Sequence, residues 1–317
     1  MHFRWARSSV SVFATLAIAL IAVGLQLSSV AIASSTQTAS YTGLIASRTT
    51  AFPWKGQDPS CEVRLPIPGF VSYGRFTTCP PKRVLLLGDS LALTIGIQMS
   101  LDEADWGTIV DNAGVDGCGF VTGYNVEFLK GRFTPLPAYC NTEAAGWISE
   151  IRSFKPQAIV VEKGWWDSFP HMIKGNVSFL TQPRYDALVK QQILGLIHSL
   201  RTVSAAPIYF LSVPWMQPNG LQSGEPEPAA SAAFHNEINR LIRSATQSAT
   251  ATHFVDISPY ITPAGHFQSD VGDDICRTSD GIHLYYSPGN LHYVHTKCGK
   301  ALQQGVLSLI RQGLAKH

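Results

Sequence analysis

Short apolar runs alternate with longer segments of helical apolar spacing along most of the chain after residue 82. The short runs are typical of buried strands and predict five of them: Val84–Leu87, Thr108–Asn112, Ala158–Glu162, Pro207–Val213 and His253–Ile257. The longer segments predict five helices: Leu91–Glu103, Thr142–Phe154, Gln182–Val203, Ala229–Ala249 and Lys297–Gln312. Because strands and helices take turns, we expect a parallel sheet with helices on both faces and a site beyond the carboxyl ends of its strands.

The first 82 residues do not follow this alternation. Arg4 and Arg7 precede an apolar stretch of 18 residues, Val10–Leu27, and small residues at 31 and 33 are typical of a signal-peptidase site. We therefore expect residues 1–33 to be a signal peptide, with an uncleaved membrane anchor as the alternative. Residues 34–82 are expected to be a linker followed by a disulfide-stapled extension, and residues 83–317 the main domain.

Composition and charge narrow the function classes. A chain of 317 residues with 45% apolar content can bury one substantial core. Without the two arginines of the expected signal peptide, 22 basic residues face 22 acidic ones. A neutral mature chain offers no electrostatic reason to bind nucleic acid, and we expect none as a partner.

Six cysteines fit an exported protein, because disulfides persist in oxidising compartments. Their spacing suggests three local pairs, although six cysteines permit many other pairings: Cys61–Cys79, Cys118–Cys140 and Cys276–Cys298. The rival interpretation, a cysteine-rich metal site, lacks any Cys-x-x-Cys pair. We expect no metal and no cofactor.

Two motifs carry the chemistry. The strand that starts near Arg83 stops at Gly88-Asp89-Ser90, so a serine follows a buried strand directly, and Asp280-Gly-Ile-His283 places a carboxylate and an imidazole three residues apart. A serine hydroxyl needs a neighbouring base to become a nucleophile, and the imidazole needs an acceptor that holds its tautomer. The plainer alternative is that Asp89 or Ser90 merely caps a helix and that His283 lies on the surface.

Together these motifs resemble the SGNH, or GDSL-type, serine hydrolase family over roughly residues 83 to 310. The resemblance implies an α/β fold, a three-layer α/β/α sandwich with a five-stranded, mostly parallel flavodoxin-like sheet. It implies Ser90 as nucleophile, His283 as general base and then acid, and Asp280 as the residue that orients the imidazole. The family also implies an oxyanion hole formed by the Ser90 amide and the Gly117 amide, with Gly119 as a substitute; the alternative is that these glycines only serve a turn.

The chain departs from the family pattern at its third motif. Where the family has Gly-x-Asn-Asp, this chain has Gly164-Trp165-Trp166-Asp167, so a tryptophan replaces an oxyanion donor whose loss can cost about 3 kcal/mol. This variant is similar to SGNH domains fused to bacterial membrane acyltransferases that O-acylate surface polysaccharides. Trp165, Trp166, Asp167 and Trp215 are the expected substrate-binding residues, the tryptophans as flat surfaces for a sugar ring; plain packing is the alternative.

We therefore expect an exported serine esterase or O-acyltransferase, secreted, periplasmic or at the cell surface. It would act on O-acyl groups, acetyl first among them, of cell-surface carbohydrate through a Ser-His-Asp acyl-enzyme. A separately encoded membrane acyltransferase is an expected partner. The alternative hypothesis is a carbohydrate-binding or scaffold protein that keeps the fold but has little or no catalytic activity.

Overall fold

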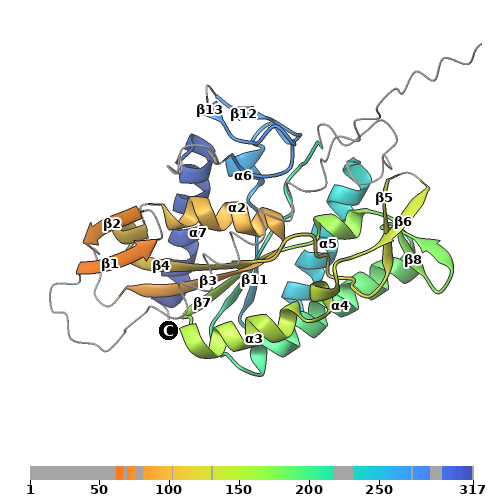
Figure 1. Cartoon of the computed structure of the whole chain (residues 1–317), viewed down its shortest axis with the longest axis horizontal. Helices are drawn as coiled ribbons and strands as arrows, with labels where there is room; N and C mark the ends of the chain where they lie inside the picture. Colours follow the sequence, from red (N-terminus) through yellow and green to blue (C-terminus); the bar gives the residue numbers. More distant parts are fainter. Residues whose placement is uncertain are drawn as a thin grey trace, which may run out of the picture.

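A five-stranded parallel sheet forms the centre of the protein (Figure 1). The structure, a computed structural model, describes residues 62–67, 70–75, 81–101, 103–129, 131–217, 231–272, 274–285 and 295–315. The strands of the sheet, in spatial order, are β11 (Thr252–Val255), β10 (Ile208–Leu211), β7 (Ala158–Glu162), β3 (Lys82–Gly88) and β4 (Thr108–Gly114). This is the flavodoxin-like order predicted from the sequence, and every neighbouring pair is parallel.

Helices cover both faces of the sheet, as Figure 1 shows. Helix α2 packs against α7 on one face, whereas α3, α4 and α5 lie together on the other. The bounds are α2 (Ser90–Ser100), α3 (Glu143–Phe154), α4 (Pro183–Arg201), α5 (Ala232–Gln247), α6 (Ser258–Ile261) and α7 (Lys297–Leu314). The predicted three-layer α/β/α fold is therefore confirmed, and each of the five predicted helices is present with ends shifted by a few residues.

The sheet is buried on both faces, which explains why its strands read as unbroken apolar runs. Val84 to Leu87 on β3 and Ala158 to Val161 on β7 have no exposed surface. Strands of this kind bury apolar side chains on alternate sides, so both helical layers share one core. The sheet thereby provides a rigid platform for the loops at its carboxyl edge.

A second, antiparallel sheet was not predicted. Its order is β6 (Arg132–Pro135), β5 (Asn125–Leu129), β8 (His171–Ile173) and β9 (Asn176–Ser178). Strands β5 and β6 lie in the segment that follows β4, and β8 and β9 lie in the segment that follows β7. Val126 on β5 pairs with His171 on β8. Two strand pairs complete the described sheets: β1 (Glu62–Ile67) with β2 (Phe70–Arg75), and β12 (Asp270–Val271) with β13 (Asp274–Ile275).

Two of the three expected disulfides are present. Cys118 bonds Cys140, and Cys276 bonds Cys298. The expected Cys61–Cys79 pair, the expected signal peptide and the linker before residue 60 lie outside the described residues. Among the residues that the structure describes, no helix combines the length and apolarity that a membrane span requires.

Candidate active site

Ser90 is the first residue of α2, immediately beyond the end of β3. Gly88 turns the chain with a φ of +144°, and a Cβ at this position would lie 1.6 Å from the carbonyl oxygen of Glu162 on β7. Only glycine fits there. Asp89 then caps the helix, because its Oδ1 accepts a hydrogen bond of 2.9 Å from the amide of Leu91.

The capping alternative is thus correct for Asp89, whereas the Ser90 hydroxyl makes no hydrogen bond within the described part of the chain. Ser90 is 8% exposed, and its hydroxyl lies at the positive end of the α2 dipole. That end of a helix favours negative charge, and the amides of the first turn have no partner within the helix. The position suits a hydroxyl that becomes an oxyanion or attacks a carbonyl carbon.

Asp280 and His283 lie in a hairpin formed by residues 276–285, which we call the catalytic hairpin. The amide of Thr278 donates to the carbonyl of His283 at 2.9 Å, and the amide of Tyr285 donates to the carbonyl of Cys276 at 2.8 Å. The Cys276–Cys298 disulfide ties one strand of the hairpin to the start of α7. The disulfide therefore fixes one strand of the hairpin that carries Asp280 and His283.

The carboxylate of Asp280 orients the imidazole of His283. Its Oδ2 lies 2.5 Å from Nδ1 of His283, and its Oδ1 accepts hydrogen bonds from the amides of Ile282 and His283 and the hydroxyl of Thr278. Burial would raise the pKa of Asp280, but the hydrogen bond and charge of His283 and the other donors outweigh it, so the pKa lies well below its ordinary value. Asp280 is therefore an acceptor for Nδ1–H, which leaves Nε2 as the basic nitrogen.

The catalytic hairpin is docked along α2. The amide of Leu284 donates to Oγ1 of Thr94 at 3.2 Å, and Nε2 of Gln98 donates to the carbonyl of Tyr285 at 3.0 Å. Thr94 lies one helical turn after Ser90 on the same face, so His283 approaches the end of α2 that carries Ser90. Nε2 of His283 is buried and has no hydrogen-bond partner in the described structure, so the hydroxyl of Ser90 and the imidazole are not bonded to each other.

Residues 115–119, which we call the Gly117 loop, follow β4 beside the start of α2. The amide of Val115 donates to the carbonyl of Gly88 at 2.8 Å, and a Cβ on Gly114 would lie 2.6 Å from the amide nitrogen of Leu93 on α2. Gly117 has a φ of +77°, which other residues adopt only with strain. The disulfide of Cys118 with Cys140 holds the next residue of this loop.

Asp167 contacts this loop and is not open to a substrate, which corrects our expectation for it. The side chain is completely buried, and its two oxygens accept hydrogen bonds from the amides of Phe120 at 2.7 Å and Val121 at 2.8 Å. Burial raises the pKa of Asp167 to about 7, against the lowering effect of these two amides. A Cβ on Gly119 would lie 3.0 Å from this carboxylate, so glycine at 119 permits the contact.

The three tryptophans differ in environment. Trp165 is 4% exposed and packs edge-on against Phe169, with ring centroids 5.0 Å apart. Trp166 is half-buried and packs on the same Phe169 ring, with centroids 5.6 Å apart. Trp215 stacks on His235 at 3.9 Å with an angle of 18° between the rings. The packing alternative therefore describes Trp166 best.

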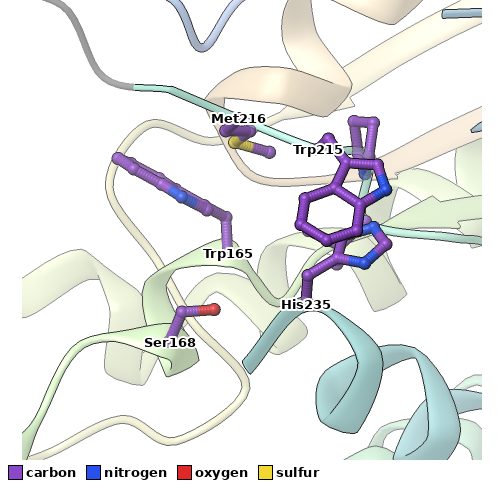
Figure 2. A pocket seen from close by; sticks show the side chains of 7 residues that line it. Trp165, Ser168, Trp215, Met216 and His235 are labelled. Carbon is purple, nitrogen blue, oxygen red and sulfur yellow. The ribbon is translucent and has the colours of Figure 1, made fainter. Parts of the chain in front are cut away.

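Trp165 and Trp215 face a common pocket (Figure 2). Figure 2 shows Trp215 over His235 on one side, and Trp165 with Met216 on the other. The pocket is lined by Trp165, Ser168, Val213, Pro214, Trp215, Met216 and His235. It lies next to the catalytic hairpin, because the amide of Gln217 donates to the carbonyl of Gly281 at 3.2 Å. Both tryptophans are among the substrate-binding residues expected from the sequence, which gave no signal for Ser168 or His235.

A buried acid pair lies directly behind Ser90. The carboxyl groups of Asp89 and Glu162 are both buried and lie close enough for each to affect the pKa of the other. Burial and the charge of Asp89 raise the pKa of Glu162 well above its ordinary value. The negative charge of Asp89 therefore disfavours ionisation of Glu162.

Two cations accompany this acid pair. Lys163 forms a buried ion pair with Glu143 and lies 5.1 Å above the ring of Trp147. Arg277 is 2% exposed and faces the charges of Glu162 and Asp280. In the sequence this cluster is marked only by Glu162-Lys163, two charged residues at the end of an otherwise apolar strand. No group of side chains within the described ranges is arranged to hold a metal ion.

Comparison with known proteins adds only distant similarity. No protein-family model and no curated protein matches the chain. A carbohydrate acetylesterase family member from Sinorhizobium meliloti aligns with a TM-score of 0.41 and 17% identity over 74% of this chain and 99% of that one. A Clostridium thermocellum family 3 carbohydrate esterase aligns with a TM-score of 0.40 and 16% identity over 73% of this chain and 98% of that one. At these scores and identities, neither match assigns an activity to this chain.

Proposed function

We propose that this protein is a serine ester hydrolase or O-acyltransferase in which Ser90, His283 and Asp280 form the catalytic triad. The observation that carries the proposal is the oriented Asp280–His283 pair, with Nδ1 and Oδ2 2.5 Å apart, on a hairpin docked along the helix that begins with Ser90. The serine and histidine are not hydrogen-bonded here, and catalytic contacts of this kind commonly tighten only when substrate binds.

The reaction follows from these positions. Oγ of Ser90 attacks the ester carbonyl carbon while Nε2 of His283 takes the hydroxyl proton, and Asp280 stabilises the imidazolium that forms. The tetrahedral intermediate collapses to an acyl-serine, and His283 returns the proton to the departing alcohol. Water or a sugar hydroxyl then attacks the acyl-serine, gives its proton to His283, and releases the acid or the new ester while Ser90 regains its proton.

The amides of Ser90 and Gly117 are the proposed oxyanion donors. The first belongs to the opening turn of α2, where amides lack helical partners, and the second lies on the loop that β4 brings beside Gly88. Trp166 supplies no side-chain donor comparable to an asparagine amide, so we expect a turnover number below that of an enzyme with three donors.

For the substrate, we propose an O-acylated carbohydrate, with acetyl as the first acyl group to test. Trp215, which stacks on His235 beside the catalytic hairpin, is the partly exposed aromatic surface that supports this proposal. Flat aromatic faces with a few polar groups suit a sugar ring. From the basic and apolar start of the chain we further propose export, and a separately encoded membrane acyltransferase remains a proposed partner.

The test compares the purified protein with Ser90→Ala on p-nitrophenyl acetate and on an O-acetylated oligosaccharide. We expect p-nitrophenol release and an acetyl adduct on Ser90 by mass spectrometry, both absent from the variant. Reaction of the wild type with a fluorophosphonate provides a second readout that needs an activated serine but no particular substrate.

A second candidate function is carbohydrate binding without catalysis. It is favoured by the unbonded Nε2 of His283 and by Trp166 at the position of the missing donor. In that case Ser90→Ala and the wild type would show the same background hydrolysis and bind the oligosaccharide equally in calorimetry. Loss of turnover in the variant with unchanged oligosaccharide binding would instead exclude this candidate.

A further inference from the structure

Arg277 is a buried cation that joins two loops of the candidate site. Its Nη1 donates to the carbonyl of Ile282 at 2.6 Å, and its Nη2 donates to the carbonyl of Trp215 at 3.0 Å. Ile282 immediately precedes His283, and Trp215 forms one wall of the pocket. A single guanidinium therefore fixes the residue beside the general base relative to the loop that faces the substrate.

Carboxyl groups on two different segments, Glu162 and Asp280, face the buried guanidinium of Arg277. The buried carboxyl groups of Asp89 and Glu162 lie behind Ser90; burial lowers the pKa of Arg277 to about 10, while Glu162 and Asp280 both favour its charged form. A buried arginine without such partners would be strongly unfavourable. The guanidinium is thus hydrogen-bonded to the Trp215 loop and within the catalytic hairpin, and it faces the charge of Glu162 at the end of β7.

We propose that Arg277 is a positioning residue that holds the backbone beside His283 against the Trp215 loop, so that the imidazole can take the proton of Ser90 when substrate binds. This proposal rests on the proposed function, because it concerns the same reaction. Arg277 does not reach the reacting atoms through any contact seen here; it acts through the backbone of Ile282 and through the Trp215 loop. Its planar fork suits two carbonyl groups at once, whereas a lysine ammonium on its flexible stem does not.

Arg277→Lys is the main variant, and Arg201→Lys is its matched control. Arg201 also donates from its guanidinium to backbone carbonyls, those of Ala206 and Ala251, but it does so where β10 and β11 begin, at the opposite edge of the sheet. Both changes remove an arginine that joins backbone segments. Only Arg277→Lys removes one that holds the general base.

We expect Arg277→Lys to lower kcat on p-nitrophenyl acetate by about 10²-fold, since a misplacement on the order of 1 Å costs that much, while KM changes less than about threefold. Arg201→Lys should lower the melting temperature and leave kcat within about twofold of the wild type. Arg277→Met serves as the more severe variant where it folds. A kcat of Arg277→Lys within twofold of the wild type, or an equal loss in Arg201→Lys, would overturn the positioning role.

Hydrogen exchange separates failure of this proposal from failure of the proposed function. The amides of Ile282, His283 and Leu284 donate to Asp280 and Thr94, and they should exchange faster in Arg277→Lys while β3 amides keep their protection. If the wild type shows no Ser90-dependent turnover, the proposed function fails, and faster exchange in the hairpin still supports positioning by Arg277. Unchanged exchange at these three amides overturns it whatever the activity.

Discussion

Replacing Asp280 by asparagine tests the role assigned to the triad acid. The carboxylate lies 2.5 Å from Nδ1 of His283, but the side chains are 42% and 24% exposed, so solvent weakens the attraction. With an effective dielectric constant of about 40 for such a half-exposed pair, Coulomb's law gives about 3 kcal/mol for stabilisation of the imidazolium, or about 200-fold in rate. We expect Asp280→Asn to lower kcat/KM on p-nitrophenyl acetate by roughly 10²-fold to 10³-fold, because the neutral amide also favours the wrong tautomer.

The control is Asp270→Asn, an exposed carboxylate on β12 that bonds only the hydroxyl of Ser269 among the described contacts. It should leave kcat/KM unchanged. The pKa of Asp280 lies below its unfolded value, so this carboxylate adds stability that is present above pH 4 or so and lost as the pH falls through the folded pKa. Asp280→Asn should therefore melt below the wild type at pH 7 and approach it in acid. A kcat/KM within threefold of the wild type would refute the orienting role.

Three further predictions concern the glycines, the disulfides and a buried histidine. Gly117→Ala and Gly131→Ala both force alanine into a left-handed conformation, at φ +77° and +74°, and should each cost about 1–2 kcal/mol in thermal unfolding, but only Gly117→Ala should lower kcat. Each described disulfide spans 22 residues, so the double serine variants of Cys118–Cys140 and Cys276–Cys298 should each lose about 3 kcal/mol in denaturant unfolding; a cost for only one pair would contradict the loop argument. Burial lowers the pKa of His171 to about 4, so the unfolded chain gains a proton first as the pH falls. The wild type should lose up to about 3 kcal/mol relative to His171→Asn between pH 6.5 and pH 4, and parallel pH curves would refute this.

The sequence predicted the sheet well because its strands are buried on both faces. An unbroken apolar run such as Val84–Leu87 has few alternatives to a central strand, and the helices between such runs repeat at a helical period. The antiparallel strands were missed because they are only three to five residues long. Asn176–Ser178, for instance, is held by its pairing with His171–Ile173, a contact that no local property of the segment indicates.

The site was predictable only where its partners are close in sequence. Asp280 and His283 are three residues apart, so their pairing follows from local geometry, and the structure shows it. The interpretation of Asp167 as a substrate contact was wrong because its partners, Phe120 and Val121, lie 46 or more positions away. Arg277 was missed for the same reason, since nothing in its neighbourhood reveals that it is buried.

These two errors have a common physical origin that bears on how the site is built. Asp167 binds the amides after the Gly117 loop, and Arg277 binds the carbonyls beside His283 and in the Trp215 loop, so buried ionisable side chains hold both loops by their backbones. A buried charge is tolerated only where such hydrogen bonds compensate it, which makes each arrangement geometrically specific. The strands bring the loops to the carboxyl edge of the sheet, and these buried side chains bind the loop backbones there. Substitutions at Asp167 and Arg277 should therefore impair turnover more than their distance from Ser90 suggests.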